Sequence, residues 1–254
     1  MKFLVIGGNA AGMSAASRVK RKSPDTEVVV LEQTHEVSYG ACGLPYYVAG
    51  LNNNLDLMRI RKADQFLANG VDLRLGCDVT GADFTAKTVS YTDENGEAHV
   101  ESYDKLLIAT GSSPKVPPIP GIRQKNIFPL KTLDQAAALK LALESNPKSV
   151  VIVGGGYIGL ELAEACILQK VPEIHIVEAL DRLLNVFDPE FSEMVKTELE
   201  KNGVHIHLGE RVMSFEGEDD KVTAVKTDKD CYAADVVILS IGVSPNTRFL
   251  PEGI

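Results

Sequence analysis

The sequence has 254 residues, of which 44% are hydrophobic and 24% are charged, and its formal net charge is −9. This balance is typical of a globular protein with one or two domains, and it excludes disordered, collagenous and coiled-coil chains. No cluster of Lys and Arg indicates a nucleic-acid partner, and no apolar run is long enough to span a membrane. The four cysteines are scattered without a CxxC spacing, so we expect neither a disulfide framework nor a metal centre.

The first predicted unit starts at the amino terminus. Residues 2–32 read as an apolar strand, a glycine turn, a helix of small residues and a second strand that ends at Glu32. Such a unit binds a dinucleotide, because the turn and the helix start hold the diphosphate while the acid binds a ribose hydroxyl. The six residues of the turn are Gly7, Gly8, Asn9, Ala10, Ala11 and Gly12. Asn9 replaces the middle glycine of the usual pattern. Since the first strand runs straight into this turn, we expect no signal peptide and a cytoplasmic protein.

A cysteine follows this unit, in the stretch Ser38–Tyr47. Cys42 stands among glycine and other small residues, so its thiol could approach a flat ring such as a flavin. A helix N-terminus or a similar positive field would be needed to stabilise the thiolate. The alternative is a packed loop cysteine, which is the usual state of a free thiol.

The remainder of the first half predicts a return to the same sheet. A hairpin signal at Asn95-Gly96 precedes the buried-strand pattern Leu106–Ala109, which is followed by Thr110-Gly111. Four prolines within residues 114–120 cannot continue a helix or a central strand, so we expect the crossing between the halves there. A connecting helix is predicted over Thr132–Leu143.

The second glycine motif is complete. Gly154, Gly156 and Gly159 follow an apolar β-branched run and open a helix, and Glu178 ends the next strand 19 residues later. Two dinucleotide sites in one chain indicate electron transfer between dinucleotides, so we expect FAD in the first site and NAD in the second. A glutamate at the ribose favours NADH over NADPH, although Arg182 could weaken that preference.

The second half then repeats the first. A helix over residues 188–201, capped by Asp188, is followed by an alternating stretch that contains His205 and His207. We interpret these histidines as surface strand residues without metal-ligand spacing. The half ends in the buried-strand pattern Val236–Leu239 and the pair Ile241-Gly242.

The repeat predicts an α/β fold with two Rossmann-like units, each a parallel sheet with helices and a small antiparallel excursion. We expect an FAD-binding domain over residues 1–117, which resumes at 243–254, and an NAD(P)H-binding domain over residues 118–242.

Taken together, these motifs resemble the single-cysteine branch of the pyridine nucleotide–disulfide oxidoreductases. Within it, the chain is most similar to the coenzyme A disulfide reductases and their NADH oxidase and persulfide reductase relatives. The matching pieces are Gly7–Gly12, Ser38–Tyr47, Ala109–Gly111, Gly154–Gly159 and Ile241–Asn246. Tyr47 stands where the two-cysteine enzymes carry their second cysteine, so oxidised Cys42 would be a mixed disulfide, a persulfide or a sulfenic acid.

The resemblance implies reduction of a CoA disulfide or persulfide by NAD(P)H, with FAD between them and Cys42 as the redox-active residue. It implies that Tyr157 is the gate over the flavin and that Glu161 is the acid near the nicotinamide. The alternatives are a packed aromatic and a helix-face acid. Residues that the resemblance adds to the two cofactor sites are Ala109, Thr110, Gly111, Ile158 and Gly242.

The resemblance also implies that coenzyme A lies along the first helix. Ser14, Arg18 and Arg21 share one helix face and could hold it together with Ser38. The alternative is a solvated basic face. Two departures matter: Ala41 replaces the asparagine that often precedes the cysteine, and the first turn lacks the histidine of the peroxidases and water-forming oxidases. The missing histidine argues against peroxide as the main substrate, although leakage of electrons from the flavin to oxygen stays possible.

Family members continue well beyond Ile254, so we expect the chain to be truncated at its carboxyl end. The residues beyond would complete the FAD site and add a homodimerisation domain. Two alternatives therefore stay open: an NADH oxidase that reduces oxygen, and a nucleotide-binding fragment without turnover.

Overall fold

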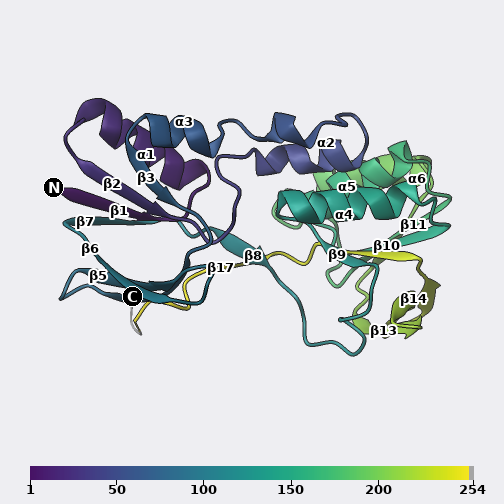
Figure 1. The fold of residues 1–254 in the computed structure, drawn as a ribbon. Helices are drawn as coiled ribbons and strands as arrows, with labels where there is room; N and C mark the ends of the chain where they lie inside the picture. Colours follow the sequence, from purple (N-terminus) through teal and green to yellow (C-terminus); the bar gives the residue numbers. More distant parts are fainter. Residues whose placement is uncertain (252–254) are drawn as a thin grey trace. The chain divides into compact units, whose positions relative to one another are not determined.

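The structure is a computed structural model that describes residues 1–251 (Figure 1). This part of the chain divides into two compact units. The first unit contains Met1–Gly40, Asp56–Ser112 and residues 245–251, and the second contains Ala41–Leu55 and Ser113–Ser244. Each unit has a parallel sheet, helices and a smaller antiparallel sheet, which confirms the predicted fold class.

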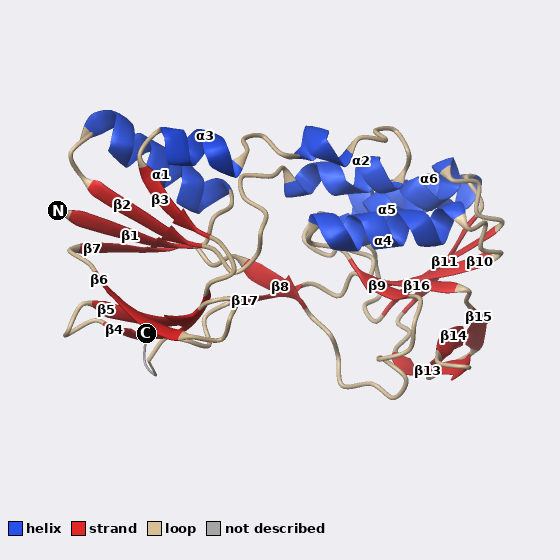
Figure 2. Cartoon of the chain, in the orientation of Figure 1, coloured by secondary structure: helices blue, strands red, loops and turns tan. Residues whose placement is uncertain are grey.

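The parallel sheet of the first unit has the strand order β3-β2-β1-β7. Its strands are β1 (Lys2–Ile6), β2 (Glu27–Leu31), β3 (Val71–Arg74) and β7 (Lys105–Ile108). One face carries the helices α1 (Ala10–Lys22) and α3 (Ala63–Ala68). The other face carries an antiparallel sheet of β4 (Asp78–Asp83), β5 (Thr88–Thr92) and β6 (Ala98–Ser102) (Figure 2).

Both faces of this parallel sheet are buried. Alternate residues of a strand point to opposite faces, so Val5 packs with Met13 of α1 and Phe66 of α3, whereas Leu4 packs with Tyr91 of the antiparallel sheet. A strand covered on both faces needs a continuous apolar run rather than an alternating one. This requirement explains the sequence Phe3-Leu-Val-Ile6.

The parallel sheet of the second unit has the order β12-β11-β10-β16-β9. Its strands are β9 (Ile127–Pro129), β10 (Ser149–Val153), β11 (Glu173–Glu178), β12 (Val204–Leu208) and β16 (Val236–Leu239). The helices are α2 (Leu44–Val48), α4 (Leu133–Glu144), α5 (Tyr157–Leu168) and α6 (Pro189–Lys201). An antiparallel sheet of β13 (Val212–Glu218), β14 (Lys221–Thr227) and β15 (Cys231–Ala233) packs on the face opposite α4 and α5 (Figure 2).

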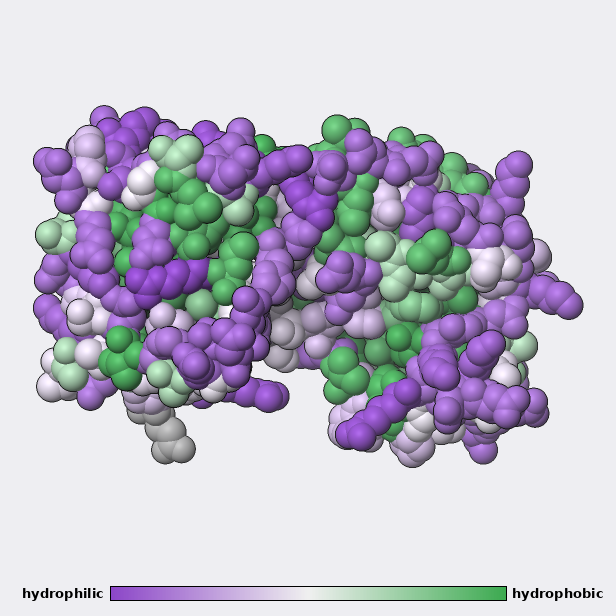
Figure 3. Space-filling model, viewed as in Figure 1, coloured by the Kyte–Doolittle hydropathy of each residue, from purple (hydrophilic) through white to green (hydrophobic). Residues whose placement is uncertain are grey.

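Short elements mark the places where the chain passes between the units. Ser112–Pro114 (β8) pairs with Val243–Pro245 (β17) at the third and last passages. The one-turn helices η1 (Ala41–Gly43) and η2 (Leu55–Met58) flank the 41–55 segment. Figure 3 shows mainly hydrophilic side chains on the face in view, in keeping with a charged fraction of 24%.

The second unit differs from the predicted domain in residues 41–55, which the sequence placed in the first domain. Helix α2 packs against α4 and α5, and its Leu44 and Val48 are buried there. A five-residue helix cannot be stable alone, so its place depends on the surface that covers its apolar side chains. That surface belongs to the second unit.

The interpretation of His207 as a surface residue is wrong. His205 is exposed, but His207 is half-buried and lies in a polar chain with His175, Tyr232 and Glu210. The His175 Nδ1 to His207 Nε2 distance is 3.0 Å, and the His207 Nδ1 to Tyr232 hydroxyl distance is 3.1 Å. The Tyr232 hydroxyl donates to Glu210 at 2.7 Å. The sequence did not predict this hydrogen-bonded row of side chains, because His175 and His207 lie on separate strands.

Candidate functional site

The two glycine turns have the same backbone geometry. Gly7 and Gly154 have φ values of +106° and +108°, which side chains rarely allow. A Cβ on Gly7 would lie 2.2 Å from the Ala109 carbonyl oxygen, and one on Gly154 would lie 2.6 Å from that of Ser240. Glycine is therefore required at the first position of both turns.

The third glycine of each turn allows the helix to start directly beside the strand. A Cβ on Gly12 would lie 1.8 Å from the Gly7 carbonyl oxygen, and one on Gly159 would lie 2.1 Å from that of Gly154. Close packing at this position brings the backbone N–H groups of the helix start to the edge of the sheet.

The middle position does not require glycine for backbone reasons. Asn9 has a φ of −101° and Gly156 has a φ of −84°, and both conformations are open to any residue. A Cβ on Gly156 would meet no atom within 4 Å. The Asn9 side chain turns aside and accepts a hydrogen bond from the Tyr39 N–H at 3.0 Å. The degenerate first motif thus keeps the geometry of the complete one.

The predicted ribose acids occupy equivalent places. The Glu32 carboxylate accepts from the Gly8 N–H at 2.6 Å and from the Thr34 N–H at 2.8 Å. The Glu178 carboxylate accepts from the Gly155 N–H at 2.6 Å and from the Leu180 N–H at 2.9 Å. Each acid lies beside its glycine turn, where an adenosine ribose would reach it.

The starts of α1 and α5 suit an anion. Neither first turn contains an acidic residue, and neither helix has a side-chain cap. By contrast, the first turns of α3, α4 and α6 contain Asp64, Asp134 and Glu190. A helix N-terminus has unpaired N–H groups and a positive partial charge. Both turns therefore fit the diphosphate of a dinucleotide such as FAD or NADH.

The strands β7 and β16 lie beside β1 and β10, and each is followed by a further glycine, Gly111 after β7 and Gly242 after β16. Gly111 and Gly242 have φ values of +62° and +96°, and a Cβ on either would meet no atom within 4 Å. Thr110 donates its hydroxyl to the Asn246 carbonyl oxygen at 2.7 Å, and the Asn246 amide donates to the Thr110 carbonyl oxygen at 2.9 Å. Ala109 is the residue that packs on Gly7. The sequence motif included Asn246 but did not reveal this reciprocal pairing.

Cys42 is one of two exposed thiols in the described residues. It lies in η1, immediately before the residue that caps α2, whereas the other exposed thiol, Cys231, lies on β15. Cys77 and Cys166 are buried, and burial raises the pKa of the Cys166 thiol to about 12. A thiol of that pKa is protonated at neutral pH and unreactive.

Tyr157 and Glu161 lie on the first two turns of α5. Tyr157 is exposed, and its ring contacts that of Phe187 edge-on with centroids 5.8 Å apart. Burial raises the pKa of Glu161, and the neighbouring charge of Glu164 adds to this effect.

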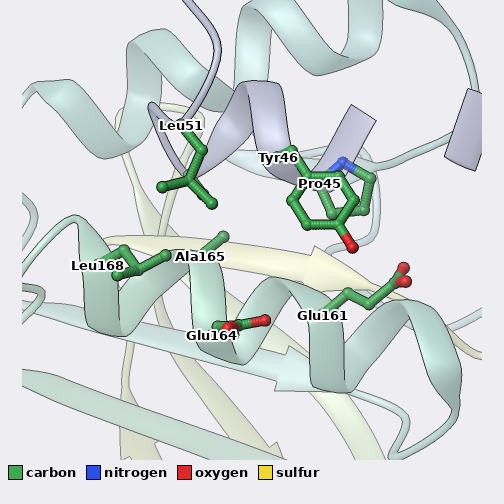
Figure 4. A pocket seen from close by; sticks show the side chains of 8 residues that line it. Pro45, Tyr46, Leu51, Glu161, Glu164, Ala165 and Leu168 are labelled. Carbon is green, nitrogen blue, oxygen red and sulfur yellow. The ribbon is translucent and has the colours of Figure 1, made fainter. Parts of the chain in front are cut away.

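Glu161 also lines a small pocket between α2 and α5 (Figure 4). Pro45 and Tyr46, which follow Cys42 closely in the chain, form the other wall. In Figure 4 the Tyr46 hydroxyl and the Glu161 carboxylate are directed to the same end of the pocket. The structure thus brings the cysteine-bearing segment and the α5 acid together within the second unit.

The residues predicted to hold coenzyme A belong to the first unit. Ser14, Arg18 and Arg21 are exposed on α1, as their spacing predicts. Ser38 has a left-handed φ of +50°, and its N–H donates to the Gly8 carbonyl oxygen at 3.0 Å. Ser38 is therefore tied to the first glycine turn.

Among the described residues, no helix is long and apolar enough to cross a membrane. A family model described as pyridine nucleotide-disulphide oxidoreductase matches residues 1–254. The chain is 41% identical to the CoA-dependent NAD(P)H sulfur oxidoreductase of Pyrococcus abyssi over 244 residues, which covers 96% of the chain and 54% of that protein. It is 35% identical to an NADH oxidase of Enterococcus faecalis, with coverage of 100% and 57%.

A solved structure agrees. The NAD-dependent persulfide reductase from A. fulgidus superposes with a TM-score of 0.92 at 36% identity, over 97% of this chain and 47% of that one. The chain thus spans about half the length of the proteins it matches. Because the family model matches residues 1–254, the chain belongs to the pyridine nucleotide-disulphide oxidoreductase family.

Proposed function

We propose that this chain forms the nucleotide-binding part of an FAD-dependent NAD(P)H oxidoreductase that reduces a CoA disulfide or persulfide through Cys42. The observation that carries the proposal is the duplicated arrangement of glycine turn, uncapped helix start and acid, once in each unit. The names of the Pyrococcus and A. fulgidus proteins support the sulfur substrate and the nicotinamide donor.

FAD is assigned to the first unit. Its diphosphate would face the turn from Gly7 to Gly12 and the N–H groups that open α1, and Glu32 would accept from a ribose hydroxyl. Ala109, Thr110 and Gly111 would line the opposite wall. Bound FAD supplies a two-electron carrier between the nicotinamide and sulfur.

The nicotinamide dinucleotide is assigned to the second unit. Gly154, Gly156, Ile158 and Gly159 would hold its diphosphate, with Glu178 at the ribose and Gly242 opposite. Because Glu178 is an anion, it would repel a 2′-phosphate, so NADH is the preferred donor. The Arg182 guanidinium, which donates to the Asn185 carbonyl oxygen at 3.3 Å, is the residue that would admit NADPH.

Tyr157 and Glu161 would act at the nicotinamide end of this site. The Tyr157 ring is exposed and rests edge-on against Phe187, so it can turn aside when a dinucleotide enters. Burial raises the pKa of Glu161, so this carboxyl group takes up a proton more readily than an exposed one would.

Cys42 would carry out thiol–disulfide exchange. Its thiolate attacks one sulfur of CoA disulfide, forming a Cys42–CoA mixed disulfide and releasing one CoA thiolate. Two electrons from NADH and one proton then convert the mixed disulfide into the Cys42 thiolate and CoA thiol. Tyr47 occupies the position five residues on, so no resolving cysteine follows there.

The exposed side chains of α1 support the choice of coenzyme A. Arg18 and Arg21 offer planar donors for its phosphates, while Ser14 and Ser38 offer hydroxyl groups. We further propose a cytoplasmic protein whose longer form is a homodimer.

A second candidate is an NADH oxidase that reduces oxygen, which the name of the Enterococcus protein favours. A third is a nucleotide-binding fragment without turnover, because the chain spans about half of its relatives.

One assay separates these candidates. NADH oxidation by the FAD-loaded chain is followed with CoA disulfide under argon, and with oxygen alone. We expect CoA-disulfide-dependent oxidation that Cys42→Ser abolishes, while NADH still reduces the flavin of that variant. Cys231→Ser, which removes the other exposed thiol, is the matched control and should retain turnover. Disulfide turnover that survives Cys42→Ser would refute the role of Cys42.

A further inference from the structure

Lys140 of α4 is a buried cation that neither nucleotide site uses. Only 7% of its surface is exposed, and it is the one Lys or Arg in the described chain that counts as buried. Removing an ammonium group from water is costly unless its donors are satisfied. The hydrogen-bond partners of Lys140 therefore indicate the structural role of this side chain.

The partners of Lys140 lie mainly on the cysteine-bearing segment. Its Nζ donates to the Tyr47 carbonyl oxygen at 3.1 Å and to Asn53 Oδ1 at 2.9 Å, and it lies 5.1 Å from the centroid of the Tyr47 ring. An ion pair with Glu144 on its own helix, at 3.2 Å, accounts for the third donor. Two of the three ammonium donors thus hold residues 41–55 to α4.

A second side chain holds the same end of α2. Gln169, at the end of α5, donates its amide to the Val48 carbonyl oxygen at 3.1 Å. The last carbonyl groups of a helix have no partners within it, so Lys140 and Gln169 supply partners from two other helices. Gly50 has a φ of +79°, and a Cβ there would lie 3.1 Å from Gln169 Nε2 and 3.6 Å from Lys140 Nζ. The glycine leaves room for both donors.

We propose that Lys140, assisted by Gln169, is a positioning residue for Cys42. These two residues form a clamp: they fix the carboxyl end of α2 against α4 and α5. Leu44 and Val48 of α2 are buried beneath it. Cys42 comes one residue before the cap of α2, so the clamp makes the thiol part of the unit that contains Tyr157 and Glu161. The chemical role of Cys42 rests on the proposed function, but the clamp itself does not.

The clamp is tested by amide hydrogen exchange of residues 44–50 in the full chain. Losing a hydrogen bond from a charged donor corresponds to one or two powers of ten in an opening equilibrium, so Lys140→Met should speed exchange there by about tenfold or more. Lys140→Arg should restore most of the protection. Glu144→Gln removes the ion pair but leaves the bonds to the segment, and Lys148→Met changes an exposed lysine nearby, so neither should alter exchange.

Asn53→Ala keeps the test valid if Lys140→Met does not fold. Asn53 is exposed, so its loss cannot disrupt a core, yet it removes one of the two bonds to the segment. It should speed exchange of residues 44–50 by about threefold to tenfold. Unchanged exchange in both Asn53→Ala and Lys140→Met would overturn the clamp.

Thiol kinetics test the positioning itself. In a Cys231→Ser background, the rates at which Cys42 reacts with CoA disulfide and with hydroxyethyl disulfide are compared. A thiol held in one environment discriminates between these disulfides, so Lys140→Met should move the ratio of rates at least about threefold toward one, and Lys140→Arg should restore it. An unchanged ratio would refute positioning. Failure of the parent chain to react with CoA disulfide would instead refute the proposed function and leave the exchange result intact.

Discussion

Asn9 in the first unit and Gly156 in the second occupy the same position between strand and helix, yet they are used differently. The Asn9 side chain bonds to the Tyr39 N–H and so fastens its turn to the next segment. A Cβ on Gly156 would meet no atom within 4 Å, so the space beside this turn is open. The same backbone geometry therefore occurs in a turn that a side-chain hydrogen bond holds to the next segment and in a turn without such a bond.

The difference suits two kinds of ligand. We expect the turn with the Asn9 bond to hold a cofactor that stays bound, and the open turn to hold a dinucleotide that enters and leaves. The acids do not differ in this way, because Glu32 and Glu178 each bond to the glycine N–H at 2.6 Å. The contrast between the units therefore resides in the middle residue and its surroundings.

The largest expected effect comes from the first glycine of each turn. Gly7→Ala and Gly154→Ala should each destabilise the protein by about 3 kcal/mol, since both force a left-handed alanine against a backbone carbonyl. Gly7→Ala should abolish FAD binding and Gly154→Ala should abolish NADH binding, as measured by calorimetry beside thermal unfolding. Gly81→Ala, where a Cβ meets no atom within 4 Å, is the control. Loss of both ligands from either variant would contradict independent sites.

Exchanging the middle residues tests the comparison directly. Gly156→Asn should leave the unfolding temperature unchanged but weaken NADH binding about tenfold, because the side chain would occupy the diphosphate approach. Asn9→Gly should lower the free energy of unfolding by about 1 kcal/mol through loss of the bond to Tyr39, while FAD still binds. Equal NADH affinity in Gly156→Asn would show that the open turn has no role.

The remaining effect concerns the pH dependence of stability, which we expect in the second unit. Burial lowers the pKa of His175, with help from His207 and His205, and burial also lowers that of His207. The unfolded chain then binds more protons than the native state as pH falls below the unperturbed value of about 6.5, so stability should decrease on acidification. The slope should not exceed about 1.4 kcal/mol per pH unit for each histidine.

This prediction is checked by urea unfolding between pH 5 and 7.5, with probes in each unit. A His175→Gln/His207→Gln double variant should flatten the profile, whereas the exposed His205→Gln should not. A pH dependence confined to the first unit would contradict the assignment to this histidine pair.

The local patterns predicted what local chemistry determines. Short-range requirements determine the positive φ at Gly7 and Gly154, the continuous apolar strands and the acids that follow them. The sequence therefore predicts the repeat. The burial of Lys140 could also have been predicted, because it shares a helix face with the buried residues Leu133, Ala136 and Leu143.

The sequence did not predict contacts between segments that are far apart in the chain. Nothing within residues 41–55 indicates which unit covers Leu44 and Val48, because that depends on α4 and α5. Likewise, β11 and β12 align His175 with His205 and Val177 with His207. Only the register of the paired strands reveals that three histidines and Tyr232 meet.

We propose that this chain holds two different dinucleotides in two similar turns. The most direct measurement is anaerobic titration of the purified, FAD-loaded chain with NADH, followed by the flavin absorbance. We expect one FAD per chain and bleaching of the flavin at about one NADH per chain. A chain that stays colourless after FAD loading, or a bound flavin that NADH never bleaches, would contradict it.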